Sequence, residues 1–295
     1  SDTGSVSTDT FAVLPGVEQV TRIMRPYKLA SREFHKDPTL VPLGGEIVGG
    51  NKVLLIAGPC AVESHEQLLK TAQHVKRLGA TALRGGAYKP RSSPFSFQGL
   101  GEEGLRILAE VKREVGLPIV SEVTDPHYLD AMVGVVDVLQ VGARNMQNYT
   151  LLRAVGQCAQ PIILKRGLAA TISEWLQAAD YVLAAGGSQL MLCERGIRTF
   201  ETATRFTLDV ASVGIIKRSS HLPVLVDPSH AAGHYQLVPT LARAAVAAGA
   251  DGLLIEVHPD PANAMSDGLQ SLTFSDSERL VTELRAIAGA MGREM

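Results

Sequence analysis

The stretch VLVDPSHAAGHYQLVPTLARAAVAAGADGLLIEV (residues 224–257) contains two short apolar runs separated by a segment with a helical pattern. The runs at 224–226 and 252–256 are apolar without alternation, which is typical of strands buried on both faces of a parallel sheet. Between them, apolar side chains recur every three or four residues and mark one helix face: Leu237, Leu241, Ala245 and Ala248. The stretch therefore predicts a strand, a helix and a second, parallel strand.

The same alternation extends from residue 53 to the end of the chain. Eight apolar runs predict eight buried strands, at residues 53–57, 81–84, 119–123, 138–141, 162–164, 190–193, 224–226 and 252–256. Eight strand–helix units within about 240 residues favour an α/β fold of the (β/α)8 TIM barrel type over a doubly wound sheet, in which about five to seven strands are usual.

The beginning of the chain lacks this alternation. Residues 1–10 are rich in Ser, Thr, Asp and Gly and are expected to form a disordered tail, while residues 11–35 are too few for a domain. Residues 40–48 predict a small hairpin around the two glycines at 44 and 45. The expected division is a tail, extension and hairpin over residues 1–50 and one catalytic barrel over residues 51–295.

Composition and charge exclude several classes of protein. The 28 Lys and Arg residues against 30 Asp and Glu residues give a net charge of −2, which argues against nucleic-acid or membrane-surface binding. No apolar run approaches the roughly 18 residues of a membrane span, and the first residues lack a signal-peptide pattern. Three cysteines, Cys60, Cys158 and Cys193, do not make a disulfide framework. We therefore expect a soluble cytoplasmic protein with reduced thiols.

Every predicted strand ends at one or more ionisable residues, where the catalytic groups of barrel enzymes lie. In chain order these are Cys60; Arg84 with Lys89 and Arg91; Glu122; Arg144; Lys165 with Arg166; Glu194 with Arg195; Asp227 with His230; and Glu256 with His258. Seven of these groups are basic, although the chain is slightly acidic. A cationic ring of this kind predicts a site for more than one phosphate or carboxylate group.

Four residues of the same face form a candidate metal site: Cys60, His230, Glu256 and Asp267. A thiolate, an imidazole and two carboxylates suit Mn²⁺, Fe²⁺, Co²⁺ or Zn²⁺ better than Mg²⁺ or Ca²⁺. Spacing alone leaves an ordinary structural interpretation open, because buried cysteine is a common core residue and Asp-Gly is common in turns.

Seven ordered segments, spread along the whole predicted barrel, resemble one family. They are GPCAVES (58–64), LRGGAYKPRSSPFSFQGLGEEGL (83–105), QVGARNMQNYTLL (140–152), LKRGLAATISEWLQAADY (164–181), LCERGIRTFETATRFTLD (192–209), VDPSHAAGH (226–234) and IEVHPDPANAMSDGLQSL (255–272). Over about residues 20–292 the chain resembles the class I 3-deoxy-D-arabino-heptulosonate 7-phosphate (DAHP) synthases of type Iβ. The resemblance implies a transferase that condenses phosphoenolpyruvate with erythrose 4-phosphate, the first step of the shikimate pathway to aromatic amino acids.

The resemblance also implies roles for individual residues. Cys60, His230, Glu256 and Asp267 match the family's ligands for one divalent metal ion, and Cys60 and His230 belong to its catalytic centre. The positions that match its phosphoenolpyruvate site are Arg84, Lys89, Arg144, Lys165 and Arg195. Arg91 and Ser92 match the site for the aldose phosphate.

The chemistry implied by the resemblance needs an acid and a positioned water. A metal ion would polarise the aldehyde, C3 of the enol would attack it, water would add at C2 and phosphate would depart with C–O cleavage. Lys89 is the expected proton donor to the developing alkoxide, and Glu122 is expected to position the water.

Regulation and assembly are expected to follow the family only in part. Residues 17–35 resemble only the tail of the ferredoxin-like regulatory extension that many type Iβ relatives carry. We therefore expect a short form that tyrosine and phenylalanine do not inhibit, which an inhibition titration checks. Control by a separate regulatory protein is left open, and we expect a homodimer or homotetramer.

Three other functions compete with this interpretation. The related 3-deoxy-octulosonate 8-phosphate synthases use arabinose 5-phosphate and resemble KANRS where this chain has KPRSS (89–93). A Schiff-base aldolase would use Lys165 as its nucleophile. A non-catalytic phosphosugar-binding or regulatory barrel would be expected to lack at least one of the four candidate metal ligands.

Overall fold

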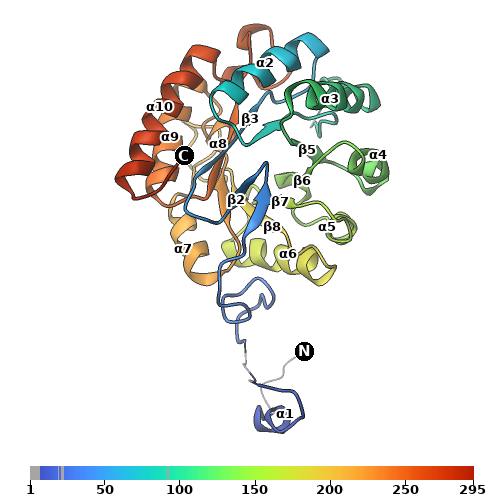
Figure 1. The fold of residues 1–295 in the computed structure, drawn as a ribbon, viewed down its shortest axis with the longest axis vertical. Helices are drawn as coiled ribbons and strands as arrows, with labels where there is room; N and C mark the ends of the chain where they lie inside the picture. The colour runs from blue at the N-terminus through green and yellow to red at the C-terminus, as the bar shows by residue number, and fades with distance from the viewer. Residues whose placement is uncertain (1–6, 19, 21–22, 92) are drawn as a thin grey trace.

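A closed barrel of eight parallel strands forms the centre of the protein, as the sequence predicts (Figure 1). The computed structural model describes residues 7–18, 20, 23–91 and 93–295. The strands are β3 (Leu54–Gly58), β4 (Ala82–Arg84), β5 (Ile119–Val123), β6 (Val138–Val141), β7 (Ile162–Lys165), β8 (Leu190–Glu194), β9 (Val224–Val226) and β10 (Gly252–Glu256). Each predicted strand lies within one residue of its observed bounds. β10 pairs with both β9 and β3, so the barrel closes between its last and first strands.

Helices surround the barrel and cover the outer face of its strands (Figure 1). The α-helices are α2 (His65–Arg77), α3 (Glu102–Val115), α4 (Leu129–Val133), α5 (Tyr149–Gly156), α6 (Ile172–Ala184), α7 (Ala211–Ser219), α8 (Pro228–Ala232), α9 (Val238–Ala247) and α10 (Phe274–Ala290). Short 3₁₀ helices lie in the loops: η1 (Pro126–Tyr128), η2 (Ala143–Asn145), η3 (Tyr235–Leu237), η4 (Pro261–Asn263) and η5 (Gly268–Gln270).

Residues that commonly cap helices stand at the ends of these helices. The Thr171 side chain accepts a hydrogen bond from the Glu174 backbone, and the Glu174 side chain caps the Thr171 backbone in return. Gly116 ends α3 in the left-handed conformation, where a side chain would be strained. The apolar face of each helix then packs on the strands in one continuous core, in which Trp175 is completely buried.

A second, smaller core fills the inside of the barrel at the amino ends of the strands. The predicted hairpin, β1 (Val41–Leu43) and β2 (Glu46–Val48), is confirmed and closes this end with Val41, Leu43 and Val48. Its turn residue Gly44 has φ +60°, and an added Cβ there would lie 2.4 Å from the Thr81 carbonyl oxygen. The hairpin thus shares a core with the barrel, and the division at residues 50 and 51 stays a prediction.

The chain before the hairpin is attached to the barrel from Tyr27 onward, since Tyr27 is buried in the main core. Asp180 of α6 accepts hydrogen bonds from the backbone N–H groups of Lys28 and Ala30, at 2.5 and 2.8 Å. Farther back, α1 (Asp9–Ala12) forms one helical turn that stands apart from the barrel (Figure 1), so the expected disordered tail is wrong for residues 9 and 10. Residues 1–6 lie outside the described part of the chain.

Among the described residues, no helix is both long and apolar enough to cross a membrane.

Candidate active site and metal centre

A cavity of about 320 Å³ lies at the carboxyl ends of the barrel strands, at the opposite end from the hairpin. We call it the carboxyl-end cavity. The predicted site residues that line it are Cys60, Arg84, Lys89, Arg91, Glu122, Arg144, Lys165, Arg195, His230 and Asp267. Glu256 is fully buried beside them, and Ser92 lies outside the described residues. Residues between positions 60 and 267, carried by the strand ends and the loops that follow them, therefore meet in one place.

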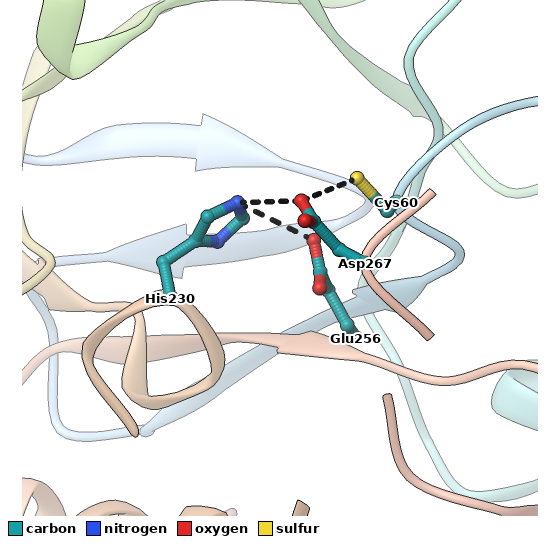
Figure 2. Close-up of side chains that lie close together, drawn as sticks. All are labelled: Cys60, His230, Glu256 and Asp267. Atoms are coloured by element: carbon teal, nitrogen blue, oxygen red, sulfur yellow. Dashed lines mark hydrogen bonds and ion pairs between the residues drawn. The ribbon is translucent and has the colours of Figure 1, made fainter. Parts of the chain in front are cut away.

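The four residues of the candidate metal site lie together, and we call them the donor cluster (Figure 2). One ligand atom from each of Cys60, His230, Glu256 and Asp267 lies within 4.8 Å of the others. The Sγ of Cys60 is 3.2 Å from Asp267 Oδ2, and Nε2 of His230 is 3.5 Å from Glu256 Oε1. Neighbouring strands bring them together, because Cys60 follows β3, His230 lies in α8 after β9, and Glu256 ends β10.

The chemistry of the donor cluster fits a transition-metal ion. His230 places its Nδ1 2.7 Å from Asp227 Oδ2, which leaves Nε2 directed toward the two carboxylates. A carboxylate behind a histidine is the usual outer-shell arrangement of metal-bound imidazole. Burial and the Glu256 charge raise the pKa of the Cys60 thiol to about 12, so a cation is needed to stabilise the thiolate here. The four residues therefore suit the predicted metals, and their role as ligands stays a prediction.

Asp267 occupies an unusual backbone position. Its φ of +52° is the only positive value for a residue other than glycine in the described chain, and such a conformation is kept where surrounding contacts enforce it. Burial raises the pKa of this carboxyl, but the charges of His230 and Arg205 outweigh that effect and hold it at about 2. Asp267 is thus ionised and fixed in place beside the cavity.

The carboxyl-end cavity is strongly cationic. Seven basic side chains line it, against two carboxylates from Glu122 and Asp267. The basic side chains are Arg84, Lys89, Arg91, Arg144, Lys165, Arg195 and Arg205. Because so many like charges in a small volume repel one another, the cavity suits ligands with several negative charges.

Asp227 lies beneath these cations and neutralises only part of their charge. Its Oδ2 accepts a hydrogen bond from Lys165 Nζ at 2.5 Å and lies 3.7 Å from Arg84 Nη1. Burial raises the pKa of Asp227, but the charges of His230 and Lys165 outweigh it and hold the pKa well below its usual range. The Nη1 atoms of Arg84 and Arg195 are buried without a hydrogen-bond partner in the described chain. Such donors fit an anion in the cavity.

Lys89, in the loop after β4, and Glu122, near the end of β5, both line the cavity. Burial lowers the pKa of Lys89, but the Cys60 thiol and the Glu122 carboxylate outweigh it, so the pKa is raised. Nζ of Lys89 donates to the Cys60 carbonyl oxygen at 3.0 Å, beside the donor cluster. Gly142 leaves room for Glu122, because a Cβ at that position would lie 1.9 Å from Oε1. The cavity thus contains both a protonated amine and a carboxylate.

Two members of the predicted ring turn away from the cavity. Nη1 of Arg166 donates to Glu194 at 2.8 Å and to Asp209 at 2.7 Å, in the helix layer behind the strands. Successive residues of a strand point to opposite faces, so Lys165 and Arg195 face inward while Arg166 and Glu194 face outward. Their placement in the ring was therefore wrong. His258 also lies to one side, with Nε2 3.2 Å from Glu63.

Three polar residues at the cavity or beside the donor cluster were not predicted from the sequence. Gln140 and Arg205 line the cavity, and Gln270 is buried against Glu256. The signal for Gln140 is present, since it stands two residues after the inward-facing Val138. Arg205 lies in an irregular loop and Gln270 in the short turn η5, where the pattern of apolar residues does not predict which way a side chain points.

The closed barrel, the cationic cavity and the donor cluster define a (β/α)8-barrel enzyme whose site suits anionic substrates and a transition-metal ion. The sequence model of the DAHP synthetase I family matches residues 24–290. The chain belongs to this family.

Individual relatives agree with this assignment. A phospho-2-dehydro-3-deoxyheptonate aldolase of Thermotoga maritima is 50% identical over 287 residues, which are 97% of this chain and 85% of the relative. A crystal structure of the enzyme from that organism, described as a DAHP synthase, matches with a TM-score of 0.90 and 49% identity over 98% of this chain and 85% of that one. The resemblance and the predicted aldol-type transferase are thereby confirmed.

The rival family is more distant. A 2-dehydro-3-deoxyphosphooctonate aldolase of Acidithiobacillus ferrooxidans is 36% identical over 251 residues, 79% of this chain and 88% of the relative. The heptonate relative has the larger identity and matches a larger share of this chain, which favours the first function over this alternative.

Proposed function

We propose that the chain condenses phosphoenolpyruvate with erythrose 4-phosphate and water, giving DAHP and inorganic phosphate with the help of one divalent metal ion. The observation that carries this proposal is the cavity itself, where seven cationic side chains surround the donor cluster. Phosphoenolpyruvate brings a carboxylate and a phosphate, and the aldose brings a second phosphate. These three anionic groups account for the excess of positive charge.

Phosphoenolpyruvate is assigned to the deep part of the cavity. Arg84, Lys165 and Arg195 are only 4–6% exposed, and two of them hold buried N–H groups without partners in the described chain. Together with Lys89 and Arg144 they bind the carboxylate and the phosphate. Arg195 stacks on the ring of Phe206, 4.1 Å from its centroid, which fixes the direction of its guanidinium group.

The aldehyde is assigned to the donor cluster. Cys60, His230, Glu256 and Asp267 would hold the metal ion, which supplies Lewis acidity toward the aldehyde oxygen when bound. As the bond between C3 of the enol and the aldehyde carbon forms, Lys89 delivers a proton to the developing alkoxide. Its raised pKa keeps that proton available at neutral pH.

Glu122 and Arg91 complete the reaction. Glu122 holds the water that adds to C2, after which the bond from C2 to the phosphate oxygen breaks. Arg91, whose Nε donates to the Phe97 carbonyl at 3.0 Å and whose Nη2 donates to the Ser266 hydroxyl, binds the aldose phosphate with Ser92.

Phosphate release tests the proposal directly. The purified chain is stripped of metal and assayed with phosphoenolpyruvate, with Mn²⁺ or with chelator, using erythrose 4-phosphate and arabinose 5-phosphate in parallel. We expect metal-dependent release with the four-carbon aldose only. Release with arabinose 5-phosphate instead assigns the octulosonate reaction, and no release with either aldose favours the phosphosugar-binding barrel.

A Schiff-base mechanism at Lys165 makes the opposite prediction. Its Nζ lies 2.5 Å from the buried Asp227, so the amine is engaged by a carboxylate rather than left free to attack a carbonyl group. Activity that survives chelation and is trapped by borohydride would establish that mechanism.

The proposal also covers the native metal, the oligomeric state and the cellular compartment. The donor cluster favours Mn²⁺, Fe²⁺, Co²⁺ or Zn²⁺, which metal analysis of the purified protein distinguishes. The free cysteines Cys60, Cys158 and Cys193 support a reducing, cytoplasmic environment. A homodimer or homotetramer is proposed, and light scattering measures it.

A further inference from the structure

Gln270 lies between two charged groups without touching the cavity. Its side chain belongs to the 3₁₀ turn η5 and is 2% exposed. Its Nε2 donates to Glu256 Oε2 at 2.6 Å, and its Oε1 accepts a hydrogen bond from Arg205 Nη1 at 2.7 Å. Both ends of the amide are therefore used.

Arg205 decides which way the amide points. An arginine side chain has only donors, so Gln270 presents its oxygen to Arg205 and its NH₂ group to Glu256. With Oε2 of Glu256 occupied in this way, Oε1 faces the donor cluster, 3.5 Å from His230 Nε2 (Figure 2). The amide thus fixes the rotation of this carboxylate from the Oε2 side, while Nη2 of Arg84 donates to Oε1 at 2.8 Å.

Arg205 also contacts the other carboxylate of the cluster. Its Nη1 lies 3.6 Å from Asp267 Oδ1, the residue with the unusual positive φ. Its stem packs on Gly233, where an added Cβ would lie 2.4 Å from the Arg205 Cβ. One arginine, carried by the loop after β8, therefore reaches Asp267 directly and Glu256 through Gln270.

We propose that Arg205 and Gln270 form a positioning pair that orients the two carboxylates of the metal centre. The inference rests on the proposed function of the donor cluster, and neither residue of the pair is a ligand or a catalytic residue in it. Groups that orient metal ligands in this way typically contribute about 10- to 100-fold in metal affinity. The pair links the loop after β8 to the loop after β10.

The test measures Mn²⁺ binding by calorimetry on the metal-stripped full chain. Gln270→Met keeps the length of the side chain but removes both hydrogen bonds, and we expect a dissociation constant about 10- to 100-fold larger. Arg205→Lys keeps the charge but loses the forked geometry, and should weaken binding in the same direction by a smaller factor. Because the two residues act together, the double variant should lose less than the product of the single losses.

Gln160→Met is the matched control. Gln160 donates a similar bond, Nε2 to the Val133 carbonyl at 2.9 Å, in the loop that leads into β7 at the amino end of the barrel. Its variant should bind Mn²⁺ like the wild type. The absorption spectrum of bound Co²⁺, which reports ligand geometry, should change in Gln270→Met and stay unchanged in Gln160→Met.

The outcomes separate the inference from the function. If the wild type binds no Mn²⁺, the proposed metal centre is wrong. If the wild type binds Mn²⁺ and Gln270→Met binds it equally well with an unchanged Co²⁺ spectrum, the positioning pair is wrong. A double variant whose loss of Mn²⁺ affinity equals the product of the two single losses would also overturn the positioning pair. If Gln270→Met does not fold in the metal-free state, Arg205→Lys alone decides, because that side chain is 37% exposed.

Discussion

The two ends of the barrel interior are formed by the same strands, but one end is apolar and the other is charged. On a given strand, the apolar and the charged inward-facing residues are only two positions apart. At the amino end, inward-facing side chains such as Ala82, Val120 and Ile163 pack against the hairpin. The next inward-facing residues on those strands are Arg84, Glu122 and Lys165, which line the carboxyl-end cavity. Because side chains alternate along a strand, one layer of the barrel stabilises the fold and the next carries charge.

The difference shows where stability and activity are separated. Burial of apolar side chains at the amino end contributes about 25 cal/mol per Å² to folding, whereas burial of cations such as Arg84 and Lys165 costs free energy unless they are paired. Asp227 pairs with Lys165, and Glu256 and Asp227 both pair with Arg84, so the other cations of the cavity keep their charge for a ligand. Substitutions in the apolar layer should therefore change mainly stability, and substitutions in the charged layer mainly activity.

The largest expected effect comes from the donor cluster. Cys60→Ala removes the thiol donor, and we expect turnover to fall on the order of a thousandfold, which corresponds to about 4 kcal/mol of transition-state stabilisation. Wild-type protein assayed with chelator should lose activity similarly and recover it with Mn²⁺. Phosphate release measures both, and a variant that retained wild-type turnover would remove Cys60 from the metal centre.

In the amino-end layer, Ile163→Ala should destabilise the fold. The side chain is fully buried, so the deletion leaves a cavity and should lower the free energy of unfolding by about 3 kcal/mol. Urea unfolding measures this. At temperatures below unfolding, kcat should stay within a few-fold of the wild type; a large loss of kcat in the folded variant would show that the two layers are not separable.

In the carboxyl-end layer, Lys89→Met should lower kcat by about 100-fold, roughly 2.7 kcal/mol, because it removes the expected proton donor. Arg84→Ala is the matched variant, and there the rise in KM for phosphoenolpyruvate should dominate. If Lys89→Met kept near-wild-type turnover while Arg84→Ala did not, the acid role of Lys89 would be excluded.

The smallest effect concerns pH and lies outside both layers. Burial lowers the pKa of His74, whose Nε2 is 2.9 Å from the Ser277 hydroxyl. The unfolded chain therefore binds a proton more readily, and stability should fall as pH decreases through the ordinary histidine pKa of about 6.5, by at most about 1.4 kcal/mol per pH unit. Urea titrations of wild type and His74→Gln between pH 7.5 and about 5.5 isolate this residue. If the free energy of unfolding changed with pH equally in both proteins, His74 would not be the group responsible.

The sequence predicts the barrel well because buried strands are local apolar runs. Each strand is located to within one residue, and the glycines at 44 and 45 mark the hairpin. That the hairpin closes the barrel does not follow from its own residues, since nothing local specifies where its apolar face packs. Likewise, Arg166 follows the inward-facing Lys165 directly, so its side chain points to the opposite face of the sheet. Its position at a strand end does not by itself give that direction.

The site was predictable to the extent that its residues stand at strand ends. Arg84, Lys165 and Glu256 lie there, and strand pairing alone brings them together. Arg205 and Gln270 are brought in by loop geometry, and only their contacts reveal them. Resemblance to the family supplied roles that residue pattern alone left open.

The close approach of the Glu122 side chain to Gly142 couples the residues that these two positions accept. No side chain fits at residue 142 while the Glu122 carboxylate occupies its present position, 1.9 Å from where a Cβ would stand. The atom in the way is the end of a flexible side chain, and Gly142 has an ordinary φ of −70°, so a larger residue there should displace the carboxylate rather than disrupt the fold. For selection or library design, residues 122 and 142 should therefore be varied together, because a change at either one alters where the carboxylate can stand.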